Sequence, residues 1–277
     1  MEYRETPPVR ELAGIVRCLW TLTGRAEALG EGAQPILPDG CPEIVLHRGA
    51  PFARLSDRGP EPQAAALFAG QLDSALTLQP QGRIEVIGVR FQPFGAAAVV
   101  AGPQHALAGQ TTDLAAVAPR LARALSSAAE DATLAGAVGR VQRVLAEWCV
   151  GATIDPRVRA AVTLIGATHG RVTVGRLAEA GGLTRRHLER RFVDTVGLTP
   201  KRLARIVRFQ RALGLLERCG AASRGTDTAF ACGYADQAHF IRDFRKLAGC
   251  APGEHLLRQG ELTGFFVSGD RSGLSTR

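Results

Sequence analysis

Two segments near the C-terminus share one plan, and this repetition constrains the fold more than any other feature. Residues 174–198 and 226–250 each contain a stretch of small residues typical of a short helix, a glycine-centred turn, and an arginine-bearing amphipathic helix. Proteins present a helix to the DNA major groove with this arrangement of bracing helix, tight turn and basic helix. The sequence therefore predicts two helix-turn-helix units about fifty residues apart.

The helical period divides each second helix into an inward and an outward face. Thr184 and Asp236 stand where an N-cap side chain accepts a backbone N–H. Apolar residues at helical spacing predict the buried faces, which consist of Leu188, Phe192 and Val196 in the first unit and of Phe240, Phe244 and Leu247 in the second. The outward residues are the candidate DNA contacts: Arg185, Arg186, Glu189, Arg190, Gln237, Ala238, Arg242 and Arg245.

These outward residue types match the edges of base pairs. Arginine binds guanine through O6 and N7, glutamine suits adenine, glutamate accepts from cytosine N4, and alanine offers apolar contact to the thymine methyl. The alternative for each arginine is that it only solvates the helix surface. Paired helices of this kind also occur in proteins that bind other proteins.

The positive charge of the chain is localised. Residues 1–156 hold 13 arginines against 16 acidic residues, whereas residues 157–258 hold 19 lysines and arginines against 8 acidic residues. The overall net charge of +8 therefore originates in the segment with the repeated units. Such a basic region favours double-stranded DNA as the partner, because it releases counterions from the phosphate backbone.

Helical patterns also surround the first unit. Residues 151–157 form the expected boundary, where Pro156 is placed to begin a supporting helix. Residues 200–220 predict one long amphipathic helix, about 28 Å in length at about 1.5 Å per residue. A rigid spacer of that length can set two recognition helices about one turn of duplex apart.

The C-terminal segment resembles a known family at many positions. The matches include Leu177-Ala178, Gly182-Leu183-Thr184, His187-Leu188, Arg190, Phe192, Gly197-Leu198-Thr199-Pro200, Arg208, Ala212, Leu215-Leu216, Ala229, Ala231-Cys232-Gly233-Tyr234, Asp236-Gln237, His239-Phe240, Arg242, Phe244-Arg245 and Gly249-Cys250-Ala251-Pro252. Through these residues, 157–258 resembles the DNA-binding domain of AraC/XylS-type transcription regulators.

The resemblance implies an all-α domain with two helix-turn-helix subdomains bridged by a long helix, each reading one major groove. It places the base-facing positions on Arg186, Glu189 and Arg190, then on Gln237, Ala238 and Arg242. It also implies activation of transcription, with RNA polymerase as a partner. Gly225 and Thr228 stand where the family has two large aliphatic residues, so we expect the second unit to be less stable and to contact phosphates more than bases.

Residues 1–150 predict a separate α+β domain with a small mixed or antiparallel sheet and covering helices. A Pro-Asp-Gly turn at 38–40 precedes an apolar strand at 44–46, and residues 83–91 alternate as in a strand buried on both faces. The polar, proline-rich segment 49–62 is expected to be a loop. A short helix should begin at 94, and helices near 119–128 and 134–149 could cover the sheet, link the domains or form a dimer seam.

The N-terminal part more weakly resembles an uncharacterised bacterial domain found ahead of such DNA-binding domains. The matching residues are 37–41, 84–94 and the glycine- and alanine-rich helix that follows. The resemblance implies a regulatory domain that senses a small-molecule effector or forms a homodimer.

Enzymatic chemistry has weaker support in this sequence. The six cysteines show no Cys-x-x-Cys or zinc-finger spacing, so we expect buried free thiols, no metal and no cofactor. Cys41, Glu43 and His47 share one face of the expected strand, which leaves a Cys41-centred sensor or enzyme as one alternative. A nonspecific architectural DNA-binding protein is the other alternative. Neither displaces the interpretation as a sequence-specific, non-enzymatic regulator.

The chain has no apolar run of membrane-spanning length, and its N-terminus lacks the apolar region of a secretory signal. We therefore expect a cytoplasmic protein. In the C-terminal tail, residues 259–277, Phe265 and Phe266 are expected to dock onto the protein, with a loose end beyond them.

Overall fold

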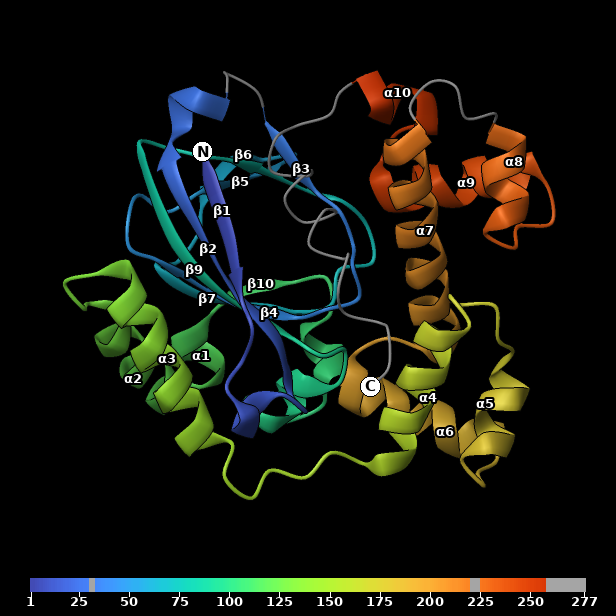
Figure 1. Ribbon diagram of the computed structural model, residues 1–277, viewed down its shortest axis with the longest axis horizontal. Coiled ribbons are helices and arrows are strands. Elements are labelled where there is room, and N and C mark those ends of the chain that lie inside the picture. Colours follow the sequence, from blue (N-terminus) through green and yellow to red (C-terminus); the bar gives the residue numbers. More distant parts are fainter. Residues whose placement is uncertain (30–32, 220–224, 258–277) are drawn as a thin grey trace.

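The computed structural model describes residues 1–29, 33–219 and 225–257. Strands dominate the first hundred residues and helices the rest (Figure 1). The ten strands of the described residues are β1 (Glu2–Thr6), β2 (Val16–Arg25), β3 (Gln34–Ile36), β4 (Glu43–His47), β5 (Ala53–Ser56), β6 (Gly59–Pro62), β7 (Ala66–Ala69), β8 (Leu76–Gln79), β9 (Arg83–Phe91) and β10 (Thr111–Asp113).

The strands form two sheets. One has the order β1-β2-β9-β4-β7-β10 and the other the order β3-β8-β5-β6. Neighbouring strands run antiparallel throughout both sheets. The expected small antiparallel sheet is thus present, together with a second sheet that the sequence did not predict.

Strand β9 is the central strand of the larger sheet. All of its residues after Arg83 are buried, as the prediction of a strand covered on both faces requires. Trp20 on β2 lies opposite Gly88 on β9, and a Cβ at position 88 would come within 1.9 Å of the indole. Glycine at 88 therefore lets the Trp20 ring lie across β9.

Two local expectations were wrong. Residues 49–62 are not a loop, because β5 and β6 form a hairpin whose β5 strand pairs with β8. Pro60 and Pro62 lie on β6, the edge strand of that sheet, where a missing N–H need not interrupt a ladder. The helix expected to begin at 94 is a short 3-10 turn, η3 (Gly95–Ala98), followed by another, η4 (Gln104–Leu107).

Three helices lie against the larger sheet: α1 (Leu114–Val117), α2 (Pro119–Ala129) and α3 (Leu134–Trp148) (Figure 1). Leu121, Leu125 and Val141 on these helices share a buried cluster with Ile44 and Ile87 of the sheet. Of the three roles considered for these helices, covering the sheet is the one that the structure shows.

The C-terminal region is helical, as predicted. Its helices are α4 (Pro156–Ala167), α5 (Val174–Ala180), α6 (Arg185–Val196), α7 (Pro200–Cys219), α8 (Gly225–Ala231), α9 (Gln237–Ala248) and α10 (Pro252–Leu257). The long helix α7 runs between a group formed by α4, α5 and α6 and a group formed by α8, α9 and α10 (Figure 1). Among the described helices, none is long and apolar enough to cross a bilayer.

The two regions pack against each other. Leu37 and Phe94 of the N-terminal region belong to the buried cluster of the helical region. Arg202 on α7 pairs with Asp73, and His105 Nδ1 lies 3.5 Å from Asp194 Oδ1 on α6. These contacts join the sheet region to the first helix-turn-helix unit and to the start of α7.

Candidate nucleic-acid interface

The first unit has a capped helix on each side of its turn. Thr173 Oγ1 accepts from Arg176 N at 3.3 Å, and Thr184 Oγ1 accepts from His187 N at 3.3 Å. Between the helices, Gly182 has φ +60°, a left-handed conformation that favours glycine. The predicted cap at Thr184 is confirmed.

The second unit repeats this construction. Asp236 Oδ1 accepts from His239 N at 2.6 Å, which confirms the predicted cap of α9. Gly233 supplies the left-handed turn residue, with φ +77°. The helices α6 and α9 end alike, because Gly197 and Gly249 both adopt left-handed conformations there.

The inward faces are buried as predicted. The buried residues are Leu188, Phe192 and Val196 on α6 and Phe240, Phe244 and Leu247 on α9. In the second unit the packing is aromatic: Phe244 makes edge contacts with Phe209 of α7 at 5.1 Å and with Phe240 at 5.7 Å between ring centroids. Burial on this face turns the opposite face of each helix toward solvent.

The eight candidate contact residues are exposed. On α6 these are Arg185, Arg186, Glu189 and Arg190, and on α9 they are Gln237, Ala238, Arg242 and Arg245. Exposure makes these side chains available to a partner, and their contact with DNA stays a prediction.

Arg185 differs from the other outward arginines. A Cβ at Gly175 would lie 2.8 Å from Arg185 Nη2, so the guanidinium packs over the start of α5. The side chain therefore braces the two helices of the first unit.

The bridging helix α7 fixes the second unit. Arg205 Nη2 pairs with Asp243 Oδ1 of α9 at 3.0 Å, and the Arg208 guanidinium lies 5.4 Å from the centre of the Tyr234 ring. A Cβ at Gly233 would come within 2.6 Å of Arg171 Cδ, so Arg171, which lies between α4 and α5, packs on the turn of the second unit. The orientation of α9 relative to α6 therefore depends on α7 and on this direct contact.

Several arginines of the basic segment form ion pairs with carboxylates of the protein and are not among the eight candidate contact residues. Arg191 Nη1 pairs with Asp155 Oδ2 at 2.6 Å, Arg202 pairs with Asp73, and Arg205 pairs with Asp243. The charge count alone could not identify them. A helical projection could have separated Arg191, since it falls off the outward face of α6.

The surroundings of Cys41 do not favour the reactive thiolate that a Cys41-centred sensor or enzyme would require. Cys41 is buried, and burial together with the Asp39 carboxylate raises the pKa of its thiol to about 12. His47 packs on Phe52 with ring centroids 5.2 Å apart. In the part of the chain that the structure describes, no group of three or more His, Cys, Asp or Glu residues could hold a metal ion.

Comparison with known families matches both regions. Residues 177–258 match the family described as a helix-turn-helix domain, and residues 4–113 match a domain of unknown function, DUF6597. The HTH-type transcriptional activator RhaS of Escherichia coli (strain SE11) is 36% identical over 84 residues, and RhaS of Escherichia fergusonii is 37% identical over 84 residues. The match covers 30% of this chain and 29% of the length of each of these relatives.

Solved structures are similar to parts of the chain. A probable AraC family transcriptional regulator from Rhodopseudomonas palustris CGA009 is 31% identical, with a TM-score of 0.35, over 38% of this chain and 97% of its own. ToxT from Vibrio cholerae is 11% identical, with a TM-score of 0.45, over 86% of this chain and 98% of its own.

Two capped helix-turn-helix units carried on one bridging helix define a bipartite DNA-binding domain of the helix-turn-helix class. The match at residues 177–258 assigns that domain to the AraC type. The chain therefore carries an AraC-type helix-turn-helix domain at residues 177–258, with a domain of unknown function at residues 4–113 ahead of it.

Proposed function

We propose that this protein is a sequence-specific transcriptional regulator that places α6 and α9 in successive major grooves of duplex DNA. One observation carries the proposal: two capped helices, both fixed to α7, expose basic faces while their apolar faces are buried. Arg186 and Arg190 supply the bidentate donors that read guanine, and Arg242 contacts phosphate. Glu189 accepts from cytosine, because an acid facing the groove disfavours binding unless it meets a donor.

The N-terminal region supplies control in this proposal. It comprises residues 1–150, contacts the first unit directly, and responds to a small-molecule effector or to homodimerisation. RNA polymerase is the proposed partner at the promoter, and the cytoplasm is the proposed location. The domain division at 150–157 is part of the same proposal.

The experiment is selection of purified full-length protein on a random duplex library at about 150 mM salt, where nonspecific phosphate binding is weak. Two enriched half-elements about one helical turn apart are the expected result. A single short element would restrict base reading to one unit. Absence of any enrichment, together with strong salt-dependent binding, would instead establish the nonspecific architectural role.

A matched pair of variants isolates the contribution of the recognition face. Arg190→Ala should weaken binding to the selected site by about 1–3 kcal/mol and relax the preference at one base pair. The control is Arg120→Ala, an exposed arginine on α2, which should bind as the unmodified protein does. Equal loss in both variants would show that charge acts without regard to position.

The Cys41-centred alternative is the less favoured one. The raised pKa of the buried thiol keeps it protonated at neutral pH, whereas a nucleophilic cysteine reacts as the thiolate. Cys41→Ser with unchanged DNA binding and effector response is the result that we expect.

A further inference from the structure

A cavity lies between the two sheets of the N-terminal region. It has a volume of about 70 Å³ and a mainly apolar wall. Side chains from both sheets line it, among them Trp20, Leu22, Phe52, Leu67 and Leu78. Since one water needs about 10–15 Å³ on this scale, the space holds about five waters.

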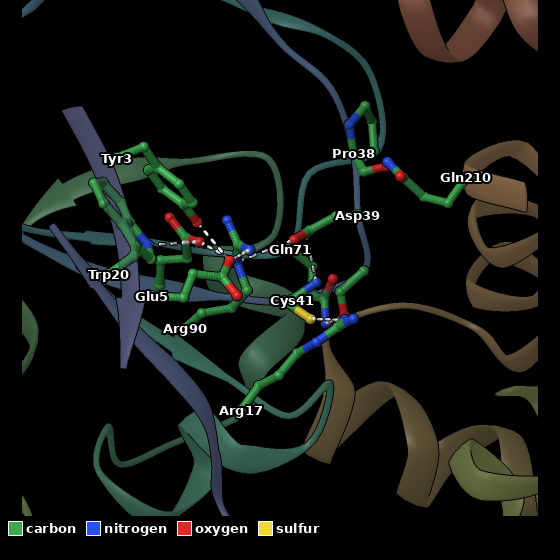
Figure 2. Close-up of polar contacts among 12 residues, drawn as sticks. Tyr3, Glu5, Arg17, Trp20, Pro38, Asp39, Cys41, Gln71, Arg90 and Gln210 are labelled. Atoms are coloured by element: carbon green, nitrogen blue, oxygen red, sulfur yellow. Dashed lines mark hydrogen bonds and ion pairs between the residues drawn. The ribbon is translucent and has the colours of Figure 1, made fainter. Parts of the chain in front are cut away.

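One end of the cavity is charged. Within the described residues, three charged side chains line it: Asp39, Glu43 and Arg90. Arg90 is 3% exposed, and its Nε lies 2.7 Å from Glu43 Oε1 and 3.4 Å from Asp39 Oδ2. Arg90 Nη1 also lies 3.4 Å from Glu5 Oε1, which does not line the cavity (Figure 2).

The carboxylates in this cluster outnumber its guanidinium. Asp39, Glu43 and Glu5 share Arg90, and the neighbouring Arg17 is directed at the Cys41 sulfur at 3.6 Å. Burial raises the pKa of Glu43, and although Arg90 opposes this, Asp39 adds to it. An entering anion would meet like charge here, whereas a cation would relieve the excess of carboxylates.

The aromatic wall favours the same ligand charge. Trp20 Nε1 donates to Glu43 Oε1 at 3.2 Å, which holds the indole beside the charged end. Phe52 provides a second ring in the cavity wall. Aromatic faces attract ammonium groups, and most strongly in sites that exclude water.

The charged end belongs to a turn that also touches the bridging helix. In the turn 37–41, Asp39 Oδ1 accepts from Cys41 N at 2.9 Å, while Pro38 O accepts from Gln210 Nε2 of α7 at 2.6 Å (Figure 2). A Cβ at Gly40 would lie 2.8 Å from Leu203 Cδ1, so the turn packs closely on α7. Cavity and bridging helix are therefore separated by a single turn.

We propose that this cavity binds a hydrophobic amine, with its ring among the apolar side chains and its ammonium on Asp39 and Glu43, and that the turn 37–41 transmits occupancy to α7. The ligand class rests on the cavity alone. The transmission rests on the proposed function, because α7 positions both DNA-binding units.

The binding test uses the full chain and three probes of similar shape. Trp148→Phe leaves Trp20 as the one tryptophan, so its fluorescence reports on the cavity. Phenethylamine should quench Trp20 saturably, whereas 3-phenylpropionate and 2-phenylethanol should bind at least tenfold more weakly. Benzylamine, which has the same ring and one methylene fewer, tests the distance between the ring and the ammonium group. Tighter or equal binding of the acid, or no saturation with any amine, would overturn the ligand class.

Two variants in the same background test the named groups. Asp39→Asn should weaken phenethylamine at least tenfold, and Ala69→Leu, which fills the wall, should weaken all three probes. Asp57→Asn, an exposed carboxylate in the β5–β6 turn, is the control and should bind unchanged. Unchanged binding in Asp39→Asn would remove Asp39 from the site, and circular dichroism separates loss of binding from loss of fold.

The transmission test adds DNA. Phenethylamine should change the affinity for a selected duplex at least fivefold, a usual size for coupling between sites. Gln210→Leu should keep amine binding and lose this change. Amine binding without any effect on DNA would overturn the transmission. If the protein selects no duplex, the proposed function fails. The fluorescence titration still tests separately whether the cavity binds an amine.

Discussion

The two helix-turn-helix units have the same plan and different supports. In the first unit, α6 lies between α4 and the η3 and η4 turns of the N-terminal region. In the second unit, α9 rests on α7, α8 and α10. The comparison shows that the N-terminal region packs directly on the first unit, whereas the second unit packs on α7.

The bracing helices differ as well. Leu177 and Ala178 of α5 are buried, while α8 offers Thr228 and Ala229 to its core and leaves Phe230 60% exposed. Thr228 has a smaller side chain than Leu177 and so contributes less apolar volume to the core. The expectation that the second unit is less stable follows from this difference and stays a prediction.

Truncation of the inward aromatics should have the largest effect. Phe192→Ala and Phe244→Ala each remove a fully buried ring and should cost about 3–5 kcal/mol. Phe192→Ala should lower the urea midpoint of the sheet region too, because α6 packs on that region. Phe244→Ala should open the second unit alone. Identical profiles for both variants would show that the two units unfold together, and the half-buried Val193→Ala is the control.

We expect the two units to contribute differently to DNA binding. Arg190→Ala is expected to relax base preference, with a loss of about 1–3 kcal/mol at the preferred site. Arg242→Ala should lower affinity for all sequences and reduce the salt dependence by about one phosphate contact. Fluorescence anisotropy at several salt concentrations measures both quantities. A loss of base preference in Arg242→Ala would assign direct base reading to Arg242 as well.

A smaller difference is expected between the two bracing helices α5 and α8, in the protection of their amides from hydrogen exchange. We expect the amides of α8 to open at a free energy about 1–2 kcal/mol below those of α5, because α8 lacks large aliphatic side chains toward the core. Native-state exchange at low urea measures this difference. Equal protection of α5 and α8 would contradict it.

The smallest effect concerns the N-cap of α4. Asp155 Oδ1 accepts from Arg157 N at 2.9 Å, and Asp155→Ala should cost about 1 kcal/mol as a lost cap. Partial burial acts to raise the pKa of Asp155, but the hydrogen bonds from Arg191 and Arg157 N hold it below its ordinary value.

A carboxylate with a lowered pKa stabilises the folded state above the ordinary pKa of aspartate, near 3.8, and loses this contribution as the pH falls through the folded value. The difference in stability between Asp155→Ala and the unmodified protein should therefore shrink below about pH 4. Denaturation at pH 7 and pH 3 measures it. A stability difference that does not change with pH would show that the charged form of Asp155 does not contribute to stability.

Local patterns predicted the helical region well because its determinants are close in sequence. The caps at Thr184 and Asp236, the inward residues and the extent of α7 depend on spacings of three to four residues. The prediction of a strand at 83–91 is confirmed for the same reason, since side chains alternate along a strand.

The features that local patterns did not predict depend on pairing between segments that are distant in the sequence. The β5–β6 hairpin resembles a loop in sequence because prolines and polar residues are tolerated on an edge strand. The charged end of the cavity forms because the strand register sets Glu43 opposite Arg90, while Glu5 comes from β1. No local pattern indicates which carboxylates meet a given arginine. The prediction that Phe265 and Phe266 dock onto the protein concerns residues outside the described ranges.

The bridging helix sets a geometric rule for any DNA that the protein recognises. Since α7 anchors both units, adding one base pair between two half-elements would turn the second by about 34° around the duplex and displace it along the axis. Neither unit could follow without breaking the Arg205–Asp243 pair or the contact of Arg171 with Gly233. If both units read bases as we propose, a binding site tolerates single-base changes better than an insertion or deletion between its half-elements.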